Sequence, residues 1–304
     1  MKNKIISVIV FSFFCVLYVH STPFSCKGIA VSVQKNDSIH DVATTLKENK
    51  CLRYKGLFEN YGVLFNIKVQ EGLYVIPERK SFFEYLFLFE KNIYRQTVKI
   101  IIPEGSTNKE IAAQCQLKLP NCDSKRFEEK VKDIEGYIFP NTYEFVGTES
   151  EDDLIKIARD EFDLQVKELF SKLTESEKKN VVILASILEK EANNEKDMRI
   201  VSGILYKRLK IGMALQVDAT LFYERGKTSA QLAVNDLRKD SLYNTYTNRG
   251  LPPTAIANPG IIAIQAALNP ESSPYLFYLT GNDGKMYYAR THEEHVKNKE
   301  LYLR

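Results

Sequence analysis

The strongest hydrophobic pattern in the chain is an almost wholly apolar segment that ends in two acidic residues. Residues 181–188 read VVILASIL, and the pattern predicts a helix that begins near Lys178 and carries Glu189 and Glu191 near its carboxyl end. At about 100° per residue, these two carboxylates point to opposite sides of the helix, each beside aliphatic side chains. Burial raises the pKa of a carboxyl group, and a carboxyl that stays protonated near neutral pH can act as a general acid. The alternative is that both side chains simply reach solvent at the end of the helix.

A second amphipathic pattern follows directly and predicts another helix, from about Glu195. Its apolar face is formed by Met198, Val201, Leu205 and Leu209. Its last turn is basic and a glycine closes it, through Lys207, Arg208, Lys210 and Gly212. Basic residues at the carboxyl end of a helix, followed by glycine, are a common termination signal. We therefore assign these charges to capping and do not assign Arg208 to substrate.

The N-terminal half alternates strand-like runs with capped helices. Residues 29–34 predict a strand, Ser38 caps a helix, and residues 71–75 predict a return strand. A related pattern recurs at residues 98–112, with a turn and cap at Pro103-Glu104-Gly105-Ser106. A strand, a capped helix and a return strand form the plan of a LysM-like sugar-binding unit. The alternative role is that this region spaces the active site from the membrane. Residues 81–90 (SFFEYLFLFE) predict a short amphipathic helix that packs on the sheet rather than touching lipid.

The first residues predict a membrane anchor. Residues 1–4 are basic, residues 5–19 form a nearly uninterrupted apolar run, and residues 20–23 offer no small-x-small cleavage site. These features favour an uncleaved N-terminal anchor over a cleaved signal peptide. Lys2 and Lys4 then lie on the cytoplasmic side and leave the bulk of the chain outside.

Several polar and aromatic motifs follow in order in the second half of the chain. They are EGYIFPNTY at 135–143, ASILEKE at 185–191, RLKIGMALQVDAT at 208–220, YNTY at 243–246, GLPP at 250–253, IANPG at 256–260 and AALNP at 266–270. From about residue 135 to 295 this series resembles the YceG-like (MltG) family of endolytic murein transglycosylases, whereas the N-terminal half matches only in architecture. The chain departs from the family pattern at Ala192, Ala214, Val217 and Ala219, where Thr, Pro, Thr and Pro are usual. These departures affect local loop rigidity rather than the acidic or aromatic residues.

The resemblance implies particular site residues. By its position in the motif, Glu189 corresponds to the catalytic acid, whereas the residues alone do not prefer it to Glu191, which remains the alternative acid. Candidate substrate-binding residues come from the later motifs: Gln216, Asp218, Thr220, Tyr243, Asn244, Tyr246 and Asn258. Alternate positions on an extended segment at 216–220 point the same way, tyrosine rings can stack on sugar faces, and amides can bind hydroxyl and N-acetyl groups. The alternatives are loop hydrogen bonding and packing, and Asn258-Pro259-Gly260 also suits a rigid structural loop.

The implied reaction is a non-hydrolytic cleavage of peptidoglycan. A transglycosylase needs one acid–base group, and the sugar's own 6-hydroxyl attacks in place of water. The resemblance implies cleavage between N-acetylmuramic acid and N-acetylglucosamine, which leaves a 1,6-anhydro end, close to nascent peptidoglycan synthesis. One alternative is a non-catalytic peptidoglycan-binding scaffold for division or elongation. The other is a muramidase-type hydrolase, for which Asp218 is the candidate second carboxylate.

Composition narrows this picture. The chain has 304 residues, of which 44% are hydrophobic and 27% charged, and its net charge of +3 is too small to suggest nucleic acid as a partner. Cys15 lies in the apolar segment, whereas Cys26, Cys51, Cys115 and Cys122 would be exported and could form disulfides in any of three connectivities. His292-x-x-His295 lacks further ligands at a known spacing, so we expect neither a metal nor another cofactor.

We therefore predict an α+β protein with four parts. These are a membrane anchor (1–22), a LysM-like α+β subdomain (27–96), a second small α+β segment that links to the catalytic part (97–134), and a mixed α/β catalytic transglycosylase domain (135–304). The expected location is the inner membrane, crossed once, with the catalytic domain on the periplasmic side. The expected partners are peptidoglycan glycan strands, the membrane and, through the resemblance, peptidoglycan synthases.

Overall fold

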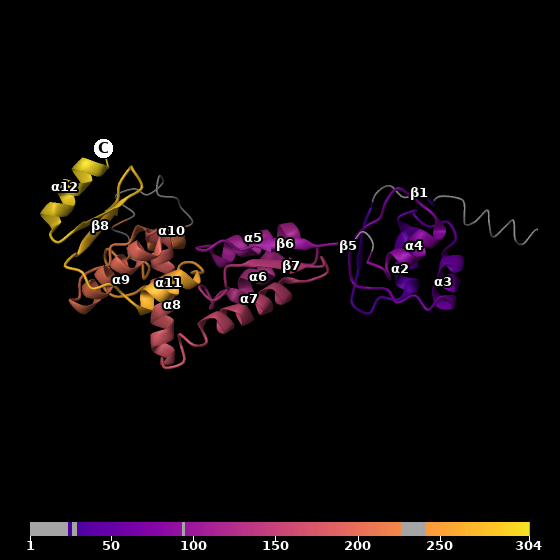
Figure 1. Ribbon diagram of the computed structural model, residues 1–304, viewed down its shortest axis with the longest axis horizontal. Coiled ribbons are helices and arrows are strands. Elements are labelled where there is room, and N and C mark those ends of the chain that lie inside the picture. The colour runs from indigo at the N-terminus through magenta and orange to yellow at the C-terminus, as the bar shows by residue number, and fades with distance from the viewer. Residues whose placement is uncertain (1–23, 26–28, 93–94, 226–236, 238–240, 304) are drawn as a thin grey trace, which may run out of the picture. The chain divides into compact units, whose positions relative to one another are not determined.

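The computed structural model describes residues 24–25, 29–92, 95–225, 237 and 241–303 (Figure 1). The chain divides into two compact units. The first takes in the chain up to Ile100 with Lys118–Asn121 and Glu144–Ser150, and the second takes in Ile101–Leu117, Cys122–Tyr143 and the chain from Glu151 onward. Both contain helices and small sheets, so the predicted mixed α+β class is confirmed.

The first unit packs helices against small antiparallel sheets. One sheet has the strand order β2-β3-β5, with Ala30 opposite Val75 and Val33 opposite Gly72. A second, two-stranded sheet joins β1 to β4. The elements are β1 (Phe24–Ser25), β2 (Ala30–Val33), α2 (Ile39–Glu48), α3 (Lys55–Leu64), β3 (Gly72–Val75), β4 (Arg79–Lys80), α4 (Phe82–Leu88) and β5 (Arg95–Gln96).

Capping and aromatic packing explain this unit. Ser38 caps α2 as predicted: its hydroxyl accepts a hydrogen bond from the N–H of Asp41, and its own N–H donates to the Asp41 carboxylate at 2.8 Å. Ser81 caps α4 in the same way. The core contains fully buried rings such as Phe58 and Phe82, whose centroids lie 5.8 Å apart. Burial of such rings accounts for much of the stability of a unit this small.

The second unit is built mainly from helices. Its elements are α5 (Asn108–Lys118), α6 (Ser124–Val131), α7 (Glu151–Val166), α8 (Glu175–Glu191), α9 (Glu195–Lys210), α10 (Asp218–Arg225), α11 (Ile261–Leu268), β8 (Phe277–Thr280), β9 (Met286–Ala289) and α12 (His292–Tyr302). The strands β6 (Val98–Ile101) and β7 (Thr142–Phe145) pair with each other, and the division between the units passes through both. The predicted cap at Ser106 is wrong by one residue, because Thr107 and Glu110 form the reciprocal cap of α5.

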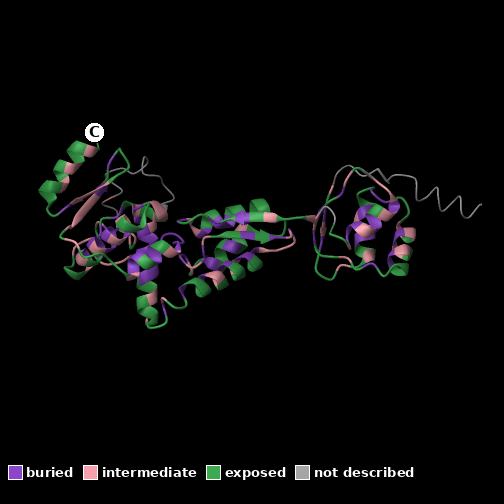
Figure 2. Cartoon of the chain, viewed as in Figure 1, coloured by how far each residue is buried: buried purple, intermediate pink, exposed green. Residues whose placement is uncertain are grey.

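Helix α8 is the centre of this unit. All of its residues from Val181 to Leu188 are buried, and it contacts α9, α10 and α11 (Figure 2). Thr174 and Glu177 form a capping box at its start. Helix α9 begins at Glu195 and is closed by Gly212 in the left-handed region (φ +67°), as the sequence predicted. Because α8 is buried from Val181 to Leu188, the direction in which its last residues point is fixed.

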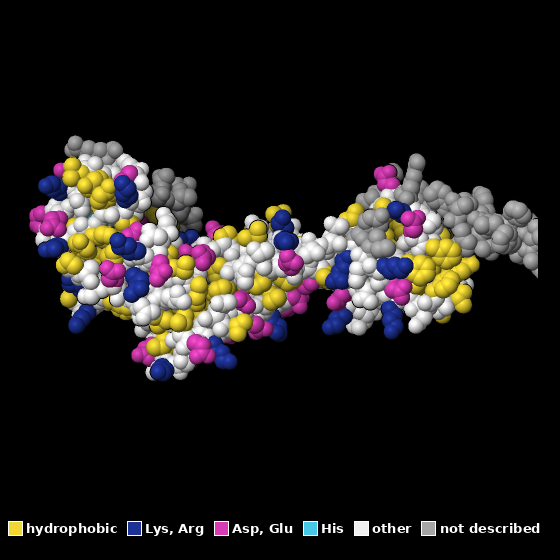
Figure 3. Space-filling model, in the orientation of Figure 1, with side chains coloured by type: hydrophobic (Ala, Val, Ile, Leu, Met, Phe, Trp, Pro, Cys, Tyr) yellow, Lys and Arg dark blue, Asp and Glu magenta, His cyan; other side chains and the backbone are white. Residues whose placement is uncertain are grey.

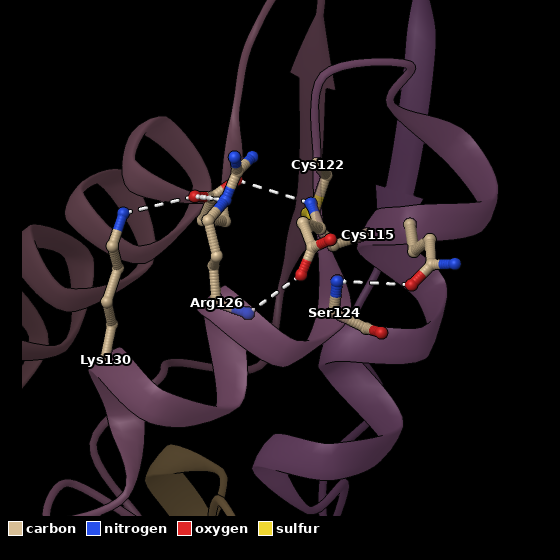
Figure 4. The surroundings of a disulfide bond; sticks show 8 residues. Cys115, Cys122, Ser124, Arg126 and Lys130 are labelled. Atoms are coloured by element: carbon tan, nitrogen blue, oxygen red, sulfur yellow. Dashed lines mark hydrogen bonds and ion pairs between the residues drawn. A yellow bond between two sulfur atoms is a disulfide. The ribbon is translucent and has the colours of Figure 1, made fainter.

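Cysteine pairing is partly defined. Cys115 and Cys122 form a disulfide that ties the end of α5 to the loop before α6 (Figure 4). Cys51 is also disulfide-bonded, whereas Cys15 and Cys26 lie outside the described residues. Among the described residues, none of the helices combines the length and the apolar character needed to cross a membrane. The anchor predicted at residues 1–22 lies outside that part of the chain.

Candidate active site

A large cleft lies in the second unit, where α5 and α6 face α10 and the end of α8. Its volume is about 980 Å³, the size of pockets that enclose substantial ligands. The lining is rich in charged side chains, with five carboxylates and three lysines: Glu110, Glu128, Glu135, Glu191, Glu224, Lys109, Lys132 and Lys190. Phe222 and Tyr223 add aromatic surface from α10. A long polar substrate with exposed ring faces suits such a lining.

Glu191, the last residue of α8, lines this cleft. Burial raises the pKa of Glu191 to about 7, and the nearby negative charge of Asp218 acts in the same direction. A hydrogen bond from the Tyr278 hydroxyl and the charge of Arg208 oppose this shift without cancelling it. A substantial fraction of Glu191 therefore carries a proton near neutral pH, as a general acid requires.

Glu189 points elsewhere, as its position on the helix predicted. Its carboxylate accepts a hydrogen bond of 2.9 Å from the N–H of Gly260, the N-cap of α11. Burial raises its pKa, and the charge of Glu104 adds to the effect. Glu189 does not belong to the described lining of the large cleft. The structure thus separates the two carboxylates and brings Glu191, the alternative acid, to the cleft.

A second cleft carboxyl group with a raised pKa, Glu135, was not singled out from the sequence. It is 7% exposed and accepts hydrogen bonds from the N–H of Asn108 (2.9 Å) and the hydroxyl of Tyr223 (3.1 Å). Burial raises the pKa of Glu135 to about 7, although both hydrogen bonds oppose the shift. The adjoining Gly136 adopts φ +92°, and a Cβ there would lie 2.5 Å from Ala255. The sequence signal that could have pointed to Glu135 was the Glu-Gly pair at the start of the EGYIFP motif.

Asn258 organises the same wall from inside. It is fully buried, its side-chain oxygen accepts from the N–H of Ile138 (2.8 Å), and its amide nitrogen donates to the Ser106 carbonyl and to Asn108 Oδ1, each at 2.9 Å. Its amide nitrogen also lies 3.3 Å from Glu135 Oε1. The side chain of Asn258 therefore bonds to other protein groups and holds the segments around Glu135 in place.

The predicted extended segment at 216–220 is wrong. Asp218 begins α10, and Gln216 adopts the left-handed region with φ +52°, a conformation in which non-glycine residues are uncommon. Thr220 is fully buried and donates to the Val217 carbonyl at 2.8 Å. The three side chains therefore do not share one face. Gln216 and Asp218 are exposed, and only Asp218 acts electrostatically on Glu191.

The YNTY segment divides between the surface and the interior. Tyr246 donates a hydrogen bond of 2.6 Å to Asp218, which places its ring in the neighbourhood of Glu191. Tyr243 contacts Thr254 through its hydroxyl (2.7 Å), and its ring centroid lies 5.4 Å from that of Tyr223. Asn244 is fully buried, and its side-chain oxygen accepts from the N–H of Tyr246 (3.0 Å).

Arg208 does more than complete a helix end, so the capping explanation is wrong for this residue. It is 4% exposed and donates to the carbonyls of Leu276 (2.7 Å) and Leu215 (2.6 Å). One of these carbonyls precedes β8, which carries Tyr278, and the other precedes the turn at Gln216. Arg208 therefore fixes the segments that surround Glu191.

The histidine pair at the C-terminus shows no metal-site geometry. No group of three His, Cys, Asp or Glu side chains that could hold a metal occurs among the described residues. Burial lowers the pKa of His295 to about 4, and its ring stacks against Phe277. His295 is thus a neutral packing residue at physiological pH.

The cleft thus holds two carboxyl groups, Glu135 and Glu191, whose pKa values burial raises to about 7. Comparison with known proteins identifies the family of the chain. The sequence model of the YceG-like family matches residues 31–301. The chain therefore belongs to the YceG-like family, and the resemblance inferred from its motifs is confirmed.

Three relatives illustrate the match. A Bacillus subtilis protein named endolytic murein transglycosylase is 28% identical, with 90% of this chain and 85% of that protein aligned. A Streptococcus pneumoniae protein of the same name is 25% identical over 90% of this chain, which spans only 58% of that longer protein. A crystal structure of a Listeria monocytogenes protein described as YceG-like superposes with a TM-score of 0.62 and 29% identity, covering 90% of this chain and 99% of that one.

Proposed function

We propose that this protein is a lytic transglycosylase that cleaves peptidoglycan glycan strands internally, with Glu191 as its acid–base group. The observation that carries the proposal is the placement of Glu191 on the wall of the 980 Å³ cleft with a pKa raised to about 7. The expectation of an enzyme of this class agrees with the names of the relatives from Bacillus subtilis and Streptococcus pneumoniae.

The reaction needs one carboxyl group acting twice. The protonated Glu191 gives its proton to the bridging oxygen as the bond from C1 of N-acetylmuramic acid to that oxygen breaks. The Glu191 carboxylate then takes the proton of the 6-hydroxyl of the same sugar as O6 bonds to C1. The products are a 1,6-anhydro end and a free 4-hydroxyl on N-acetylglucosamine, and no water is consumed. Intramolecular attack benefits from a high effective molarity.

The choice of Glu191 over Glu189 rests on access. Glu189 accepts a hydrogen bond from the N–H of Gly260 at the start of α11, which opposes but does not cancel the rise of its pKa on burial, and it does not line the cleft in the described part of the chain. Glu191 lines the cleft, and no cation forms a close ion pair with it among the described residues. Glu135, held by Asn108 and Tyr223, is proposed to position the cleft wall rather than to transfer the proton.

A hydrolase is the second candidate, because Asp218 is close enough to raise the pKa of Glu191. Asp218 accepts a hydrogen bond from Tyr246 and is exposed, so it could orient a water molecule. Two carboxyl groups flanking one glycosidic bond are the requirement for hydrolysis. The two candidates differ in their products.

The proposal extends to the rest of the chain. Residues 1–22 are proposed to be a single-pass anchor in the inner membrane, with both units on the periplasmic side, close to peptidoglycan synthases. The disulfides of Cys51 and of Cys115 with Cys122 fit an oxidising compartment. A LysM-like role in glycan binding for the first unit is supported by its order of strand, two helices and strand, with β2 antiparallel to β3.

Mass spectrometry of peptidoglycan strands digested by the purified full-length chain tests the proposal. Internal fragments with 1,6-anhydro ends are the expected products. Reducing ends formed with incorporation of ¹⁸O from labelled water would identify a hydrolase. Intact strands that still bind the protein would identify a scaffold without catalysis.

A further inference from the structure

The end of helix α3 in the first unit exposes three consecutive apolar residues. Val63, Leu64 and Phe65 are 74%, 72% and 46% exposed, and we refer to them as the α3 tip. Figure 3 shows hydrophobic atoms gathered on the surface of the first unit where α3 and α4 lie. Isolated exposed apolar residues are ordinary, but contiguous apolar surface commonly marks a contact with a partner or a membrane.

Aromatic rings and lysines border the α3 tip. The ring of Phe65 lies 5.9 Å from that of Tyr61 and 5.8 Å from that of Phe87. The Lys91 ammonium lies 5.3 Å from the centroid of Phe87, and Lys68 is exposed just beyond the helix. Rings with lysines beside them are typical of protein surfaces that enter the headgroup region of a bilayer with anionic lipids.

The chain enters the first unit close to this surface. Strand β1 pairs Phe24 with Lys80, and Ser81 then caps α4, whose Phe83 and Phe87 contact Phe65. The apolar run ends at Val19, five residues before Phe24. Five residues span at most about 18 Å, so the end of that run cannot lie far from the start of α4.

We propose that the α3 tip enters the headgroup region of the membrane in which residues 5–19 are anchored. This inference rests on the proposed anchor but not on the proposed reaction. Burial of the tip removes Val63, Leu64 and Phe65 from water, and the lysines at its border meet anionic headgroups. The first unit is then held on the bilayer surface by two attachments rather than by a free tether.

The absence of tryptophan from the chain gives a direct test. Leu64→Trp in the full-length chain places a single reporter at the tip, and Leu164→Trp, on α7 of the second unit and 64% exposed in the native protein, is the matched control. Both are reconstituted into vesicles of three parts phosphatidylethanolamine to one part phosphatidylglycerol, with or without brominated acyl chains. We expect bromolipids to quench the reporter at position 64 at least twofold more than the one at 164.

Other results would overturn the inference. Equal quenching at both positions would leave the tip in water. A blue-shifted emission at position 64 without bromolipid quenching would mean that protein, either a second copy or another segment, covers the tip. Recovery of the chain outside the vesicle fraction would remove the anchor on which the inference depends.

A second variant tests the role of the apolar surface. In the Leu64→Trp background, Val63→Glu should reduce quenching to the level of the control while leaving the circular dichroism spectrum unchanged, because Val63 is largely exposed. Unchanged quenching with Val63→Glu would show that apolar contact at the tip does not hold it in the bilayer, and would contradict the proposal. Neither measurement requires cleavage of peptidoglycan, so failure of the proposed function is detected separately.

Discussion

At two places in the second unit, the pKa values of buried carboxyl groups are shifted in opposite directions. In the cleft, burial raises the pKa of both Glu191 and Glu135 to about 7. Beside the Cys115–Cys122 disulfide, burial also acts to raise the pKa of Glu151, but hydrogen bonds from Arg126 and Lys130 outweigh it and hold the pKa at about 2 (Figure 4). The Arg126–Glu151 and Lys130–Glu151 pairs measure 2.8 and 3.1 Å.

The difference shows that cation placement, rather than burial, decides the role of each carboxyl group. Glu151 has two cations in direct contact. The charge of Arg208 also acts on Glu191, but the Nε and Nη1 of Arg208 donate to the carbonyls of Leu276 and Leu215. Glu151 is therefore ionised and structural, and Glu191 can exchange a proton near neutral pH.

The largest effect should separate the two glutamates at the end of α8. Glu191→Gln should lower the rate of strand cleavage by roughly 10²–10⁴-fold, because the amide cannot donate the proton. Glu189→Gln should remain within about tenfold of the wild type, because Glu189 contacts α11 rather than the cleft. Release of anhydro-muropeptides over time measures both rates. The reverse ranking would return the acid assignment to Glu189.

Glu151→Gln should lower the stability of the fold rather than the rate of cleavage. It removes the charge that pairs with Arg126 and Lys130, and we expect a loss of about 2 kcal/mol in the free energy of unfolding, as for hydrogen bonds to charged groups. Urea unfolding followed by circular dichroism measures the change. Glu175→Gln is the control, because Glu175 is 89% exposed and should matter by less than about 0.5 kcal/mol. Equal effects of the two variants would contradict the comparison.

The sequence predicted those parts of the fold that depend on local pattern. The buried run of α8, the cap at Ser38, the start of α9 and its closure at Gly212 follow from periodicity and capping chemistry. The prediction of an extended segment at 216–220 failed because tertiary hydrogen bonds fix its conformation. One of them runs from the N–H of Val217 to the Thr245 hydroxyl (2.9 Å). Such a contact has no signature in local spacing.

The disulfide should contribute a similar amount of stability. It closes a short loop, with a separation of seven residues between Cys115 and Cys122, for which the chain-entropy model gives about 2 kcal/mol. The Cys115→Ser/Cys122→Ser double variant should lose this amount in urea unfolding. Because Cys51 is also disulfide-bonded, reduction of the wild type should destabilise it further than the double variant. A double variant as stable as the wild type would contradict this role.

The raised pKa values of the two cleft carboxyl groups should also make the free energy of unfolding depend on pH. The folded pKa values of Glu135 and Glu191, about 7, exceed the ordinary value of 4.5. The folded state thus binds more protons than the unfolded state between pH 4.5 and 7, and stability falls as pH rises through this range. Each group contributes a slope of at most about 1.4 kcal/mol per pH unit. Thermal unfolding from pH 5 to 8 should show this decline, and the Glu135→Gln/Glu191→Gln double variant should lack most of it. A double variant with the wild-type slope would place the titrating groups elsewhere.

The site was predicted less completely than the fold. The motif resemblance pointed to the end of α8, but motif position and the geometry of the cleft favour different glutamates, because only the folded chain shows which side of α8 faces the cleft. Glu135 lies 56 positions before Glu191 in the sequence, and only the packing of α5, α6 and α10 brings both to one cavity. Thr220, Asn244 and Asn258 are polar residues in the expected motifs, yet all three are fully buried. Composition does not distinguish such internal bonds from ligand contacts.

The pH dependence of the cleavage rate at saturating substrate tests the central claim most directly. If protonated Glu191 is the general acid, the rate should fall as pH rises through about 7 and decrease tenfold per pH unit above it. Glu135→Gln should retain this limb, since Glu135 positions the cleft wall and does not donate the proton. A rate that stays constant from pH 6 to 9 would contradict the account, as would a falling limb that disappears in Glu135→Gln.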